Sequence, residues 1–113
     1  MKNLLKGSIQ SVEYHLELAI KLSIIESILV TKVNSQLQLN TDNPECQSEG
    51  IVWAKFTYLD LANYIKWASI GSIIKAIKQL ELLDIITIKK VGNMSGIFYY
   101  TLNYKELEKY ITN

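Results

Sequence analysis

Between Trp53 and Leu102, short segments of strand and helix periodicity follow one another with little chain between them. The expected elements, in chain order, are a strand at 51–56, helices at 57–65 and 69–83, and strands at 85–90 and 97–102. This order predicts an α+β fold in which one helix is held across a turn from another and a two-stranded hairpin follows.

The helix expected at 69–83 has the clearest periodicity in the chain. Its apolar residues recur at the i, i+3, i+4, i+7 spacing that buries a single stripe: Ile73, Ala76, Ile77 and Leu80. The preceding helix begins with Thr57 and Asp60, which have the spacing of a capping box. Asp84 marks the end of the second helix, because aspartate tolerates the left-handed backbone conformation better than most residues.

Residues 1–37 are expected to be helical, with helical spacing over 12–22 and again over 23–37. Ser23 and Glu26 have the form of a capping box, so either a new helix begins there or one long helix continues through. We favour two helices. The second is apolar over much of its surface, which suits a helix that is buried or faces a partner.

Residues 38–50 form the one obvious loop of the sequence, which holds the only proline and the only cysteine. We expect a surface excursion there. After a core at 51–104, a short amphipathic helix over 105–111 closes the C-terminal segment 105–113. At 113 residues the whole chain is expected to form a single domain, residues 1–113.

Positive charge is concentrated in the second half of the sequence. Residues 1–53 hold four lysines and six acidic residues, whereas residues 54–113 hold eight lysines and five acidic residues. The formal net charge of +1 is not that of a strongly basic, nonspecific nucleic-acid binder. Because every basic residue is lysine, the forked guanidinium contact to guanine cannot be made.

Several classes of function are disfavoured by what the sequence lacks. The longest apolar runs are only a few residues, and the start of the chain lacks the pattern of a secretory signal, so we expect a cytoplasmic protein with no membrane partner. A single cysteine, Cys46, excludes an intramolecular disulfide and a cysteine-rich zinc site. His15 has no neighbouring ligand set, and no nucleophile–base set is recognisable. We therefore expect no metal, no cofactor and no enzymatic activity.

One stretch resembles the recognition helix of winged helix-turn-helix proteins: Ser72-Ile73-x-Lys75-x-Ile77-x-x-Leu80-Glu81-x-x-Asp84-Ile85-Ile86. Upstream, Leu61-Ala62-x-x-Ile65 resembles the first helix of that motif. With Trp53 leading the first strand and Tyr100-Thr101-Leu102-Asn103-Tyr104 after the hairpin, residues 51–105 are similar to winged-helix domains of phages and plasmids. That group includes replication initiators, partition proteins and accessory factors of conjugative transfer. The resemblance implies binding of double-stranded DNA through the helix at 69–83 and a wing at 89–97.

Four residues of the expected recognition helix are candidate DNA contacts: Ser69, Ser72, Lys75 and Lys78. Serine and lysine can hydrogen-bond to bases or phosphates, and a helix N-terminus offers unpaired N–H groups to a phosphate. In the alternative reading, Ser69 caps the helix and the lysines form a solvated face.

Four residues of the expected wing are further candidates: Lys89, Lys90, Asn93 and Ser95. Successive residues of a strand project to opposite sides, so only one of the two lysines is expected to reach DNA from the sheet itself. The alternative is a solvated hairpin whose lysines protect a sheet edge. Tyr58, at the start of the first helix, is a candidate for stacking.

These features favour a double-stranded DNA-binding protein of a mobile element that acts as a homodimer on repeated or palindromic AT-rich sites. The apolar helix at 23–37, with 105–111, is the predicted dimer surface. Replication or transfer complexes are possible protein partners. The alternative is a winged-helix docking module that binds another protein and no DNA. Lysines converging on one face would favour DNA, whereas Glu81, Asp84 or an apolar patch on that face would favour a protein partner.

Overall fold

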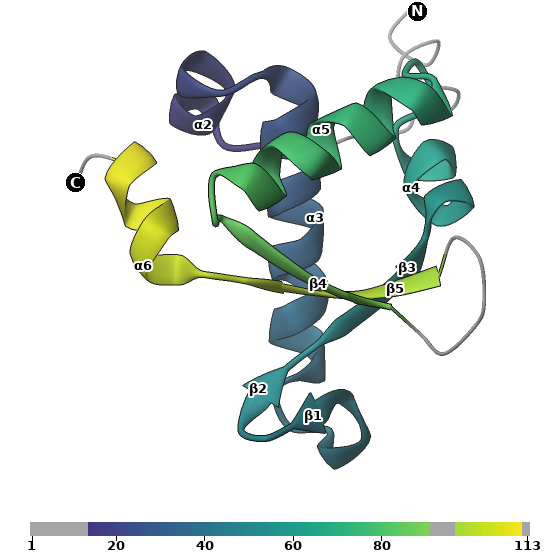
Figure 1. Ribbon diagram of the computed structural model, residues 1–113, viewed down its shortest axis with the longest axis vertical. Helices are drawn as coiled ribbons and strands as arrows, with labels where there is room; N and C mark the ends of the chain where they lie inside the picture. The colour runs from purple at the N-terminus through teal and green to yellow at the C-terminus, as the bar shows by residue number, and fades with distance from the viewer. Residues whose placement is uncertain (1–13, 91–96, 112–113) are drawn as a thin grey trace, which may run out of the picture.

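The computed structural model describes residues 14–90 and 97–111, an α+β arrangement of helices around two small antiparallel sheets (Figure 1). In chain order the helices are α2 (Leu16–Lys21), α3 (Ile24–Asn40), α4 (Tyr58–Tyr64), α5 (Ile70–Leu82) and α6 (Tyr104–Leu107). The strands are β1 (Gln47–Ser48), β2 (Ile51–Val52), β3 (Ala54–Thr57), β4 (Ile86–Lys90) and β5 (Ile97–Leu102). Two 3₁₀ helices cover Pro44–Cys46 and Glu108–Tyr110.

The larger sheet has the order β3-β5-β4, with every pair antiparallel and β5 in the centre. Residues directly opposite each other on neighbouring strands project to the same side of the sheet. The side that carries the buried Phe56, Tyr100 and Leu102 packs against the helices, and we call it the core side. The opposite side, which carries Tyr99 and Thr101, we call the outer side.

Helices α2 and α3 are separate, which confirms the prediction of two helices in this region. Ser23 caps α3, its hydroxyl accepting a hydrogen bond from the backbone N–H of Glu26 over 3.1 Å. The buried Ser27 joins the two helices, since its hydroxyl donates to the backbone carbonyl of His15 over 2.7 Å and accepts from the His15 backbone N–H over 3.0 Å.

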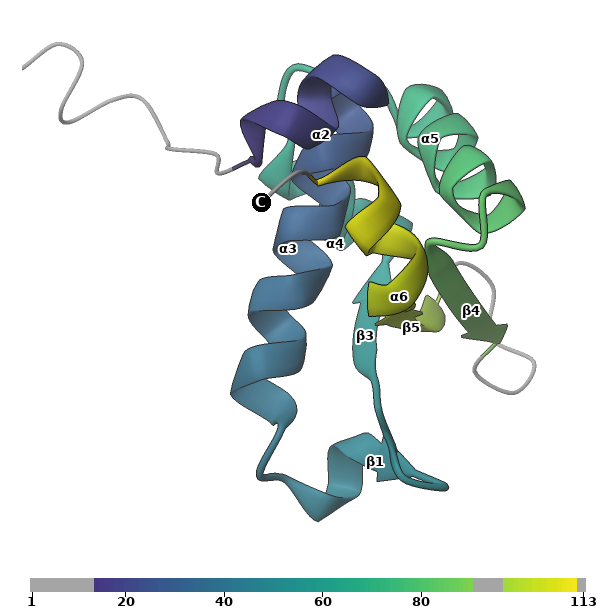
Figure 2. The same ribbon diagram turned by 90° about the vertical axis from the view of Figure 1, so that its left-hand side faces the viewer.

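Most apolar residues of α3 are buried inside the protein, with Ile24 and Leu39 at its two ends exposed, which corrects the prediction that the apolar surface of this helix forms a dimer contact. The buried set is Ile28, Leu29, Val30, Val33 and Leu37, all part of the single core cluster. Helix α3 passes behind α5 and the sheet and is covered by them (Figures 1 and 2). Its apolar surface is therefore used by the fold itself.

The segment 38–50, predicted to be a loop, is partly regular. Helix α3 continues to Asn40, and strands β1 and β2 pair as a small hairpin with Gln47 opposite Val52. The strand expected at 51–56 is divided at Trp53, so that β2 joins this hairpin and β3 joins the larger sheet. The hairpin projects from the end of the molecule opposite α5 (Figure 1), and its neighbourhood carries the exposed acids Asp42, Glu45 and Glu49.

The paired helices α4 and α5 form as the sequence predicts. The Thr57 hydroxyl accepts from the Asp60 N–H and the Asp60 carboxylate accepts from the Thr57 N–H, each over 2.9 Å, which completes a capping box. The expected stripe of α5 is buried: Ile73, Ala76, Ile77 and Leu80. This stripe fixes which residues of α5 remain on its exposed surface.

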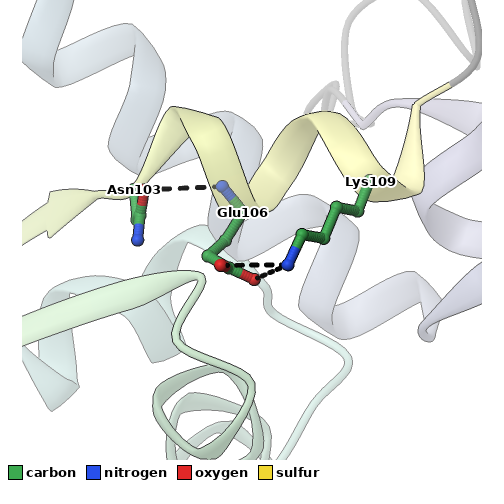
Figure 3. Close-up of polar contacts among 3 residues, drawn as sticks. All are labelled: Asn103, Glu106 and Lys109. Atoms are coloured by element: carbon green, nitrogen blue, oxygen red, sulfur yellow. Dashed lines mark hydrogen bonds and ion pairs between the residues drawn. The ribbon is translucent and has the colours of Figure 1, made fainter.

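The C-terminal helix begins one residue earlier than predicted, at Tyr104, and ends in a 3₁₀ turn (Figure 3). Asn103 caps it by accepting from the Glu106 N–H over 3.4 Å, and the Lys109 Nζ lies 3.0 Å from the Glu106 Oε2. The Tyr104 hydroxyl donates to the Asn34 amide oxygen over 2.6 Å and so attaches this segment to α3. No helix within 14–90 or 97–111 has the length and apolarity that crossing a bilayer requires.

Helix α5 ends in the left-handed conformation predicted for Asp84, whose φ is +60°. The N–H of Asp84 donates to the Glu81 carbonyl over 3.0 Å, and the N–H of Ile85 donates to the Leu80 carbonyl over 3.1 Å. Both bonds are those of a Schellman motif, which usually places glycine at this position.

Because a side chain at positive φ costs free energy, Asp84→Gly should stabilise the protein by about 1 kcal/mol. Asp84→Val, which places a β-branched residue in the same conformation, should destabilise it by at least about 1 kcal/mol. Urea unfolding followed by circular dichroism would measure both. Equal stability of the glycine and valine variants would contradict the role of the backbone conformation.

Candidate nucleic-acid interface

The exposed surface of α5 begins at its N-terminal cap. The Ser69 hydroxyl accepts from the Ser72 N–H over 3.1 Å and donates to the Ser72 hydroxyl over 2.9 Å. Ser69 therefore caps the helix, as the alternative reading of the sequence has it, while both side chains remain exposed. The cap uses one lone pair of the Ser69 hydroxyl oxygen, so this oxygen can accept one further hydrogen bond.

Lys75 lies on the flank of α5 that faces the start of α3. Ser72, Lys75 and Gln79 line one wall of a groove of about 390 Å³. The opposite wall contains Glu26, which is only 7% exposed. A phosphate that approaches Lys75 here meets a carboxylate across the groove, which offsets part of the attraction. Lys78 does not line the groove and is exposed to solvent.

The two lysines of β4 project to opposite sides of the sheet. Lys90 is paired with Phe98 and so belongs to the core side, whereas Lys89 is paired with Tyr99 and belongs to the outer side. The Lys89 Nζ lies 5.9 Å from the centre of the Trp53 ring. Lys90 is therefore the lysine of this strand on the side where α4 and α5 pack.

Tyr58 lies between α5 and the sheet rather than on an open surface. Its ring centre is 5.2 Å from that of Phe98, and the side chain is half-buried against the core. Burial, and secondarily the charge of Glu81, raises the pKa of the Tyr58 phenol. The ring packs against Phe98, so the predicted stacking of Tyr58 on a base would compete with this contact.

Helix α5 and strand β4 lie on the same side of the molecule, with α3 on the other (Figure 2). These two elements carry the exposed lysines Lys75, Lys78 and Lys90, and Glu81 is also exposed on α5. Two apolar side chains are exposed near the start of α5: Trp67 in the preceding turn at 59%, and Ile70, the first residue of the helix, at 46%. The side therefore combines basic, acidic and apolar groups. The predicted wing residues Asn93 and Ser95 lie outside the described residues.

A solved structure shares this fold. It is described as "N-Terminal domain of DNA binding protein", and it superposes with a TM-score of 0.60 over 96% of this chain and 88% of its own. The sequence identity is 14%. No protein-family model and no curated protein sequence matches the chain.

Two residues that lie beside the predicted contacts, Gln79 and Glu26, were not among the site residues predicted from the sequence. Gln79 follows Lys75 by one helical turn and shares its groove, a spacing from which it could have been predicted. Glu26 reaches the same groove from a helix distant in sequence, and nothing in the local pattern around Ser23 indicates that approach. Across residues 14–90 and 97–111, no three His, Cys, Asp or Glu residues lie close enough together to hold a metal ion.

The Ser69 cap generates a first prediction for this interface. Ser69→Ala should lower the free energy of unfolding by about 1 kcal/mol, because the first turn of α5 loses its cap. Ser69→Asp should retain the stability, since aspartate is an equally good cap. Urea unfolding of the two variants measures this difference. An alanine variant as stable as the parent protein would show that the serine contributes nothing to the helix.

The buried Tyr100 hydroxyl, which has no hydrogen-bond partner among the described residues, generates a second prediction. Burial, followed by the proximity of Tyr58 and Glu81, raises the pKa of this phenol well above 10.0. Ionisation of this phenol therefore leaves the free energy of unfolding unchanged below about pH 10, and lowers it as the pH rises further, because the unfolded state loses its proton first.

Tyr100→Phe should be about 1 kcal/mol more stable than the parent protein at neutral pH, and its stability should fall less steeply above pH 10. Tyr104→Phe is the control: it removes a hydrogen bond to Asn34 and should be less stable by about 0.5 kcal/mol. Thermal unfolding across alkaline pH compares them. A loss of stability in Tyr100→Phe at neutral pH would reveal a partner for that hydroxyl.

Proposed function

We propose that this protein binds double-stranded DNA as a winged helix-turn-helix protein, with α5 as the recognition helix and the β4–β5 hairpin, residues 89–97, as the wing. The observation that carries the proposal is that α5 and β4, the helix and the strand that such a fold offers to DNA, lie on the same side of the molecule (Figure 2) and carry the exposed lysines Lys75, Lys78 and Lys90. The order α3-β3-α4-α5-β4-β5 and the sheet order β3-β5-β4 are compatible with that fold.

The contacts follow from where each side chain lies. Ser69 and Ser72 stand at the N-terminus of α5, where backbone N–H groups and the helix dipole favour a phosphate. Lys78 and Lys90 contact phosphates of the DNA backbone, and neither lines the groove that contains Glu26. Lys75 does line that groove, so the Glu26 carboxylate weakens its attraction for a phosphate. Tyr58 contributes through its hydroxyl at the junction of α5 and the sheet. Asn93, Ser95 and Lys89 belong to the proposed wing.

Lysine-only contacts give affinity that is dominated by phosphates and depends strongly on salt. Specificity then rests on the shape of the duplex, which favours AT-rich sequences with a narrow minor groove. A single module of this size makes few base contacts, so the proposal includes a homodimer on repeated or palindromic sites. Since α3 is buried, the dimer surface lies elsewhere. The exposed Leu16 and Ile20 of α2 form an apolar stripe that suits it.

The genetic setting of the proposal is a plasmid or phage, with a role in replication, partition, transfer or transcription regulation in the cytoplasm. This part rests on the sequence resemblance across residues 51–105. The proposal assigns the protein no catalytic role and no cofactor. Proteins of a replication or transfer complex are its proposed protein partners.

A second candidate function is docking to another protein through the same side of the molecule. The exposed apolar side chains of Trp67 and Ile70, together with Glu81, favour it. These residues bracket the proposed DNA contacts at both ends of α5, so the two functions make opposite predictions for Trp67. Docking requires the indole ring, whereas phosphate contact does not.

Fluorescence anisotropy with a labelled AT-rich duplex from the neighbourhood of the gene, and with a shuffled control of the same composition, tests the proposal. Lys78→Gln and Lys90→Gln should each weaken binding and reduce the slope of log K against log salt by about 1. Lys75→Gln should have a smaller effect, because Glu26 already offsets its charge. Lys105→Gln, an exposed lysine on α6, is the matched control and should bind as the parent protein does.

Binding that is unchanged in Lys78→Gln and Lys90→Gln would refute this interface. Absence of binding to either duplex at low salt would refute duplex recognition altogether and favour the docking function. In that case Trp67→Ala should abolish binding to the protein partner and leave the melting temperature nearly unchanged, since the indole is exposed.

A further inference from the structure

The outer side of the sheet carries a row of three residues that the proposed duplex interface leaves unused apart from Lys89. Lys55 of β3 and Lys89 of β4 both lie directly opposite Tyr99 of the central strand. All three side chains project to the same side, so Tyr99 has a lysine on the neighbouring strand at each flank. Both lysines are exposed and Tyr99 is partly exposed.

A recess of about 190 Å³ adjoins this row. Lys89 and Tyr99 line it from the larger sheet, and Trp53 lines it from the junction between β2 and β3. On the other side, Ser48 of β1 and Glu45 of the preceding 3₁₀ helix complete the lining. The hairpin projects below the sheet, on the side away from α5 (Figures 1 and 2). The recess and the α5 surface are therefore separate parts of the molecule.

The backbone of Trp53 is fixed on both sides, which makes it a rigid wall. Its N–H donates to the Cys46 carbonyl over 2.8 Å, and its carbonyl accepts from the Asn40 amide over 2.9 Å. Lys89 lies over its ring at 5.9 Å. A wall held by two hydrogen bonds loses little conformational freedom when a ligand packs against it.

Proteins that bind single-stranded nucleic acids commonly do so on surfaces where aromatic side chains lie among basic ones. Unpaired bases stack on aromatic side chains, and the phosphates between them follow a positively charged path. A duplex keeps its bases inside its own stack, so it cannot place one against Tyr99. Glu45 repels a phosphate but accepts a hydrogen bond from the N–H edge of a base, which orients bases toward the hairpin and phosphates toward the lysines.

We propose that the outer side of the sheet binds single-stranded nucleic acid, with Tyr99 as the stacking surface and Lys55 and Lys89 as phosphate contacts. This activity goes beyond the proposed duplex binding and does not depend on it. Strand β4 then serves both surfaces, with Lys90 on the duplex side and Lys89 on the single-strand side.

Anisotropy with a labelled oligothymidylate of about twelve nucleotides, a length within the span of one small binding domain, tests the stacking role. Tyr99→Leu should weaken binding at least about fivefold, because it removes the ring and keeps an apolar side chain. Tyr99→Phe should bind within about twofold of the parent protein. Thermal unfolding of both variants checks that the sheet is intact. An equal loss in both, or none in either, would overturn the stacking assignment.

Two exposed lysines of the larger sheet, one on each side, provide a matched pair for the surface itself. Lys55→Gln, on the outer side, should weaken binding of the oligothymidylate several-fold and leave duplex binding nearly unchanged, and Lys90→Gln, on the core side, should do the reverse. Equal effects of the two variants on the single strand would overturn the proposal. Because duplex binding is measured separately, its failure would leave the single-strand result intact.

The two tryptophans allow contact to be observed directly. In Trp67→Phe, the remaining fluorescence comes from Trp53 in the wall of the recess. Titration with oligothymidylate, and in parallel with oligouridylate, should quench this emission, and the strand that quenches at lower concentration identifies DNA or RNA as the ligand. Absence of both quenching and anisotropy change at low salt would overturn the proposal.

Discussion

The pairing of β5 with both β3 and β4 is the constraint on which the rest of the molecule depends. Because β5 is central and antiparallel to both neighbours, the alternation of its side chains fixes the two sides of the sheet. Tyr100 and Leu102 enter the core that α3 and α5 cover, while Tyr99 faces outward. A register shift of one residue would exchange the two sides of β5, placing Tyr99 in the core and Tyr100 on the outer side. The register therefore determines both stability and the position of every charged group on the sheet.

Much of this arrangement was predictable because its signals are local. The α5 stripe and the Thr57 capping box depend on residues within two turns of one another, and the end of α5 depends on Asp84 alone. The β1–β2 hairpin was missed because its strands are two residues each, too short for a period to emerge. The apolar character of α3 was recognised, but composition cannot distinguish a helix covered by its own chain from one covered by a partner. The candidate contacts on α5 and β4 could be selected from the sequence, whereas the Glu26 groove and the Lys55–Tyr99–Lys89 row arise only from tertiary packing.

The absence of arginine gives the proposed surfaces a particular physical character. A lysine ammonium is a compact, strongly hydrated charge that favours a phosphate without fixing its orientation, whereas a guanidinium imposes a planar, bidentate geometry. Orientation must therefore come from other groups. On the α5 side these are the serine-capped helix start and the Tyr58 ring that packs against Phe98, and on the outer side they are Trp53 and Tyr99.

The acidic hairpin has a consequence for how the protein meets a polyanion. No lysine occurs between Val33 and Ala54, and Asp42, Glu45 and Glu49 lie at the end of the molecule opposite α5, which carries Lys75 and Lys78. A nearly neutral protein with its charges separated in this way has a permanent electric moment along its length. The field of a nucleic acid exerts a torque on that moment, which turns the lysine end toward the nucleic acid before contact. This effect extends over roughly 8 Å, the screening length at physiological salt. For the proposed duplex binding through α5, these acids would raise the fraction of productive collisions without contacting the duplex, and their neutralisation would slow association with duplex DNA while leaving dissociation unchanged.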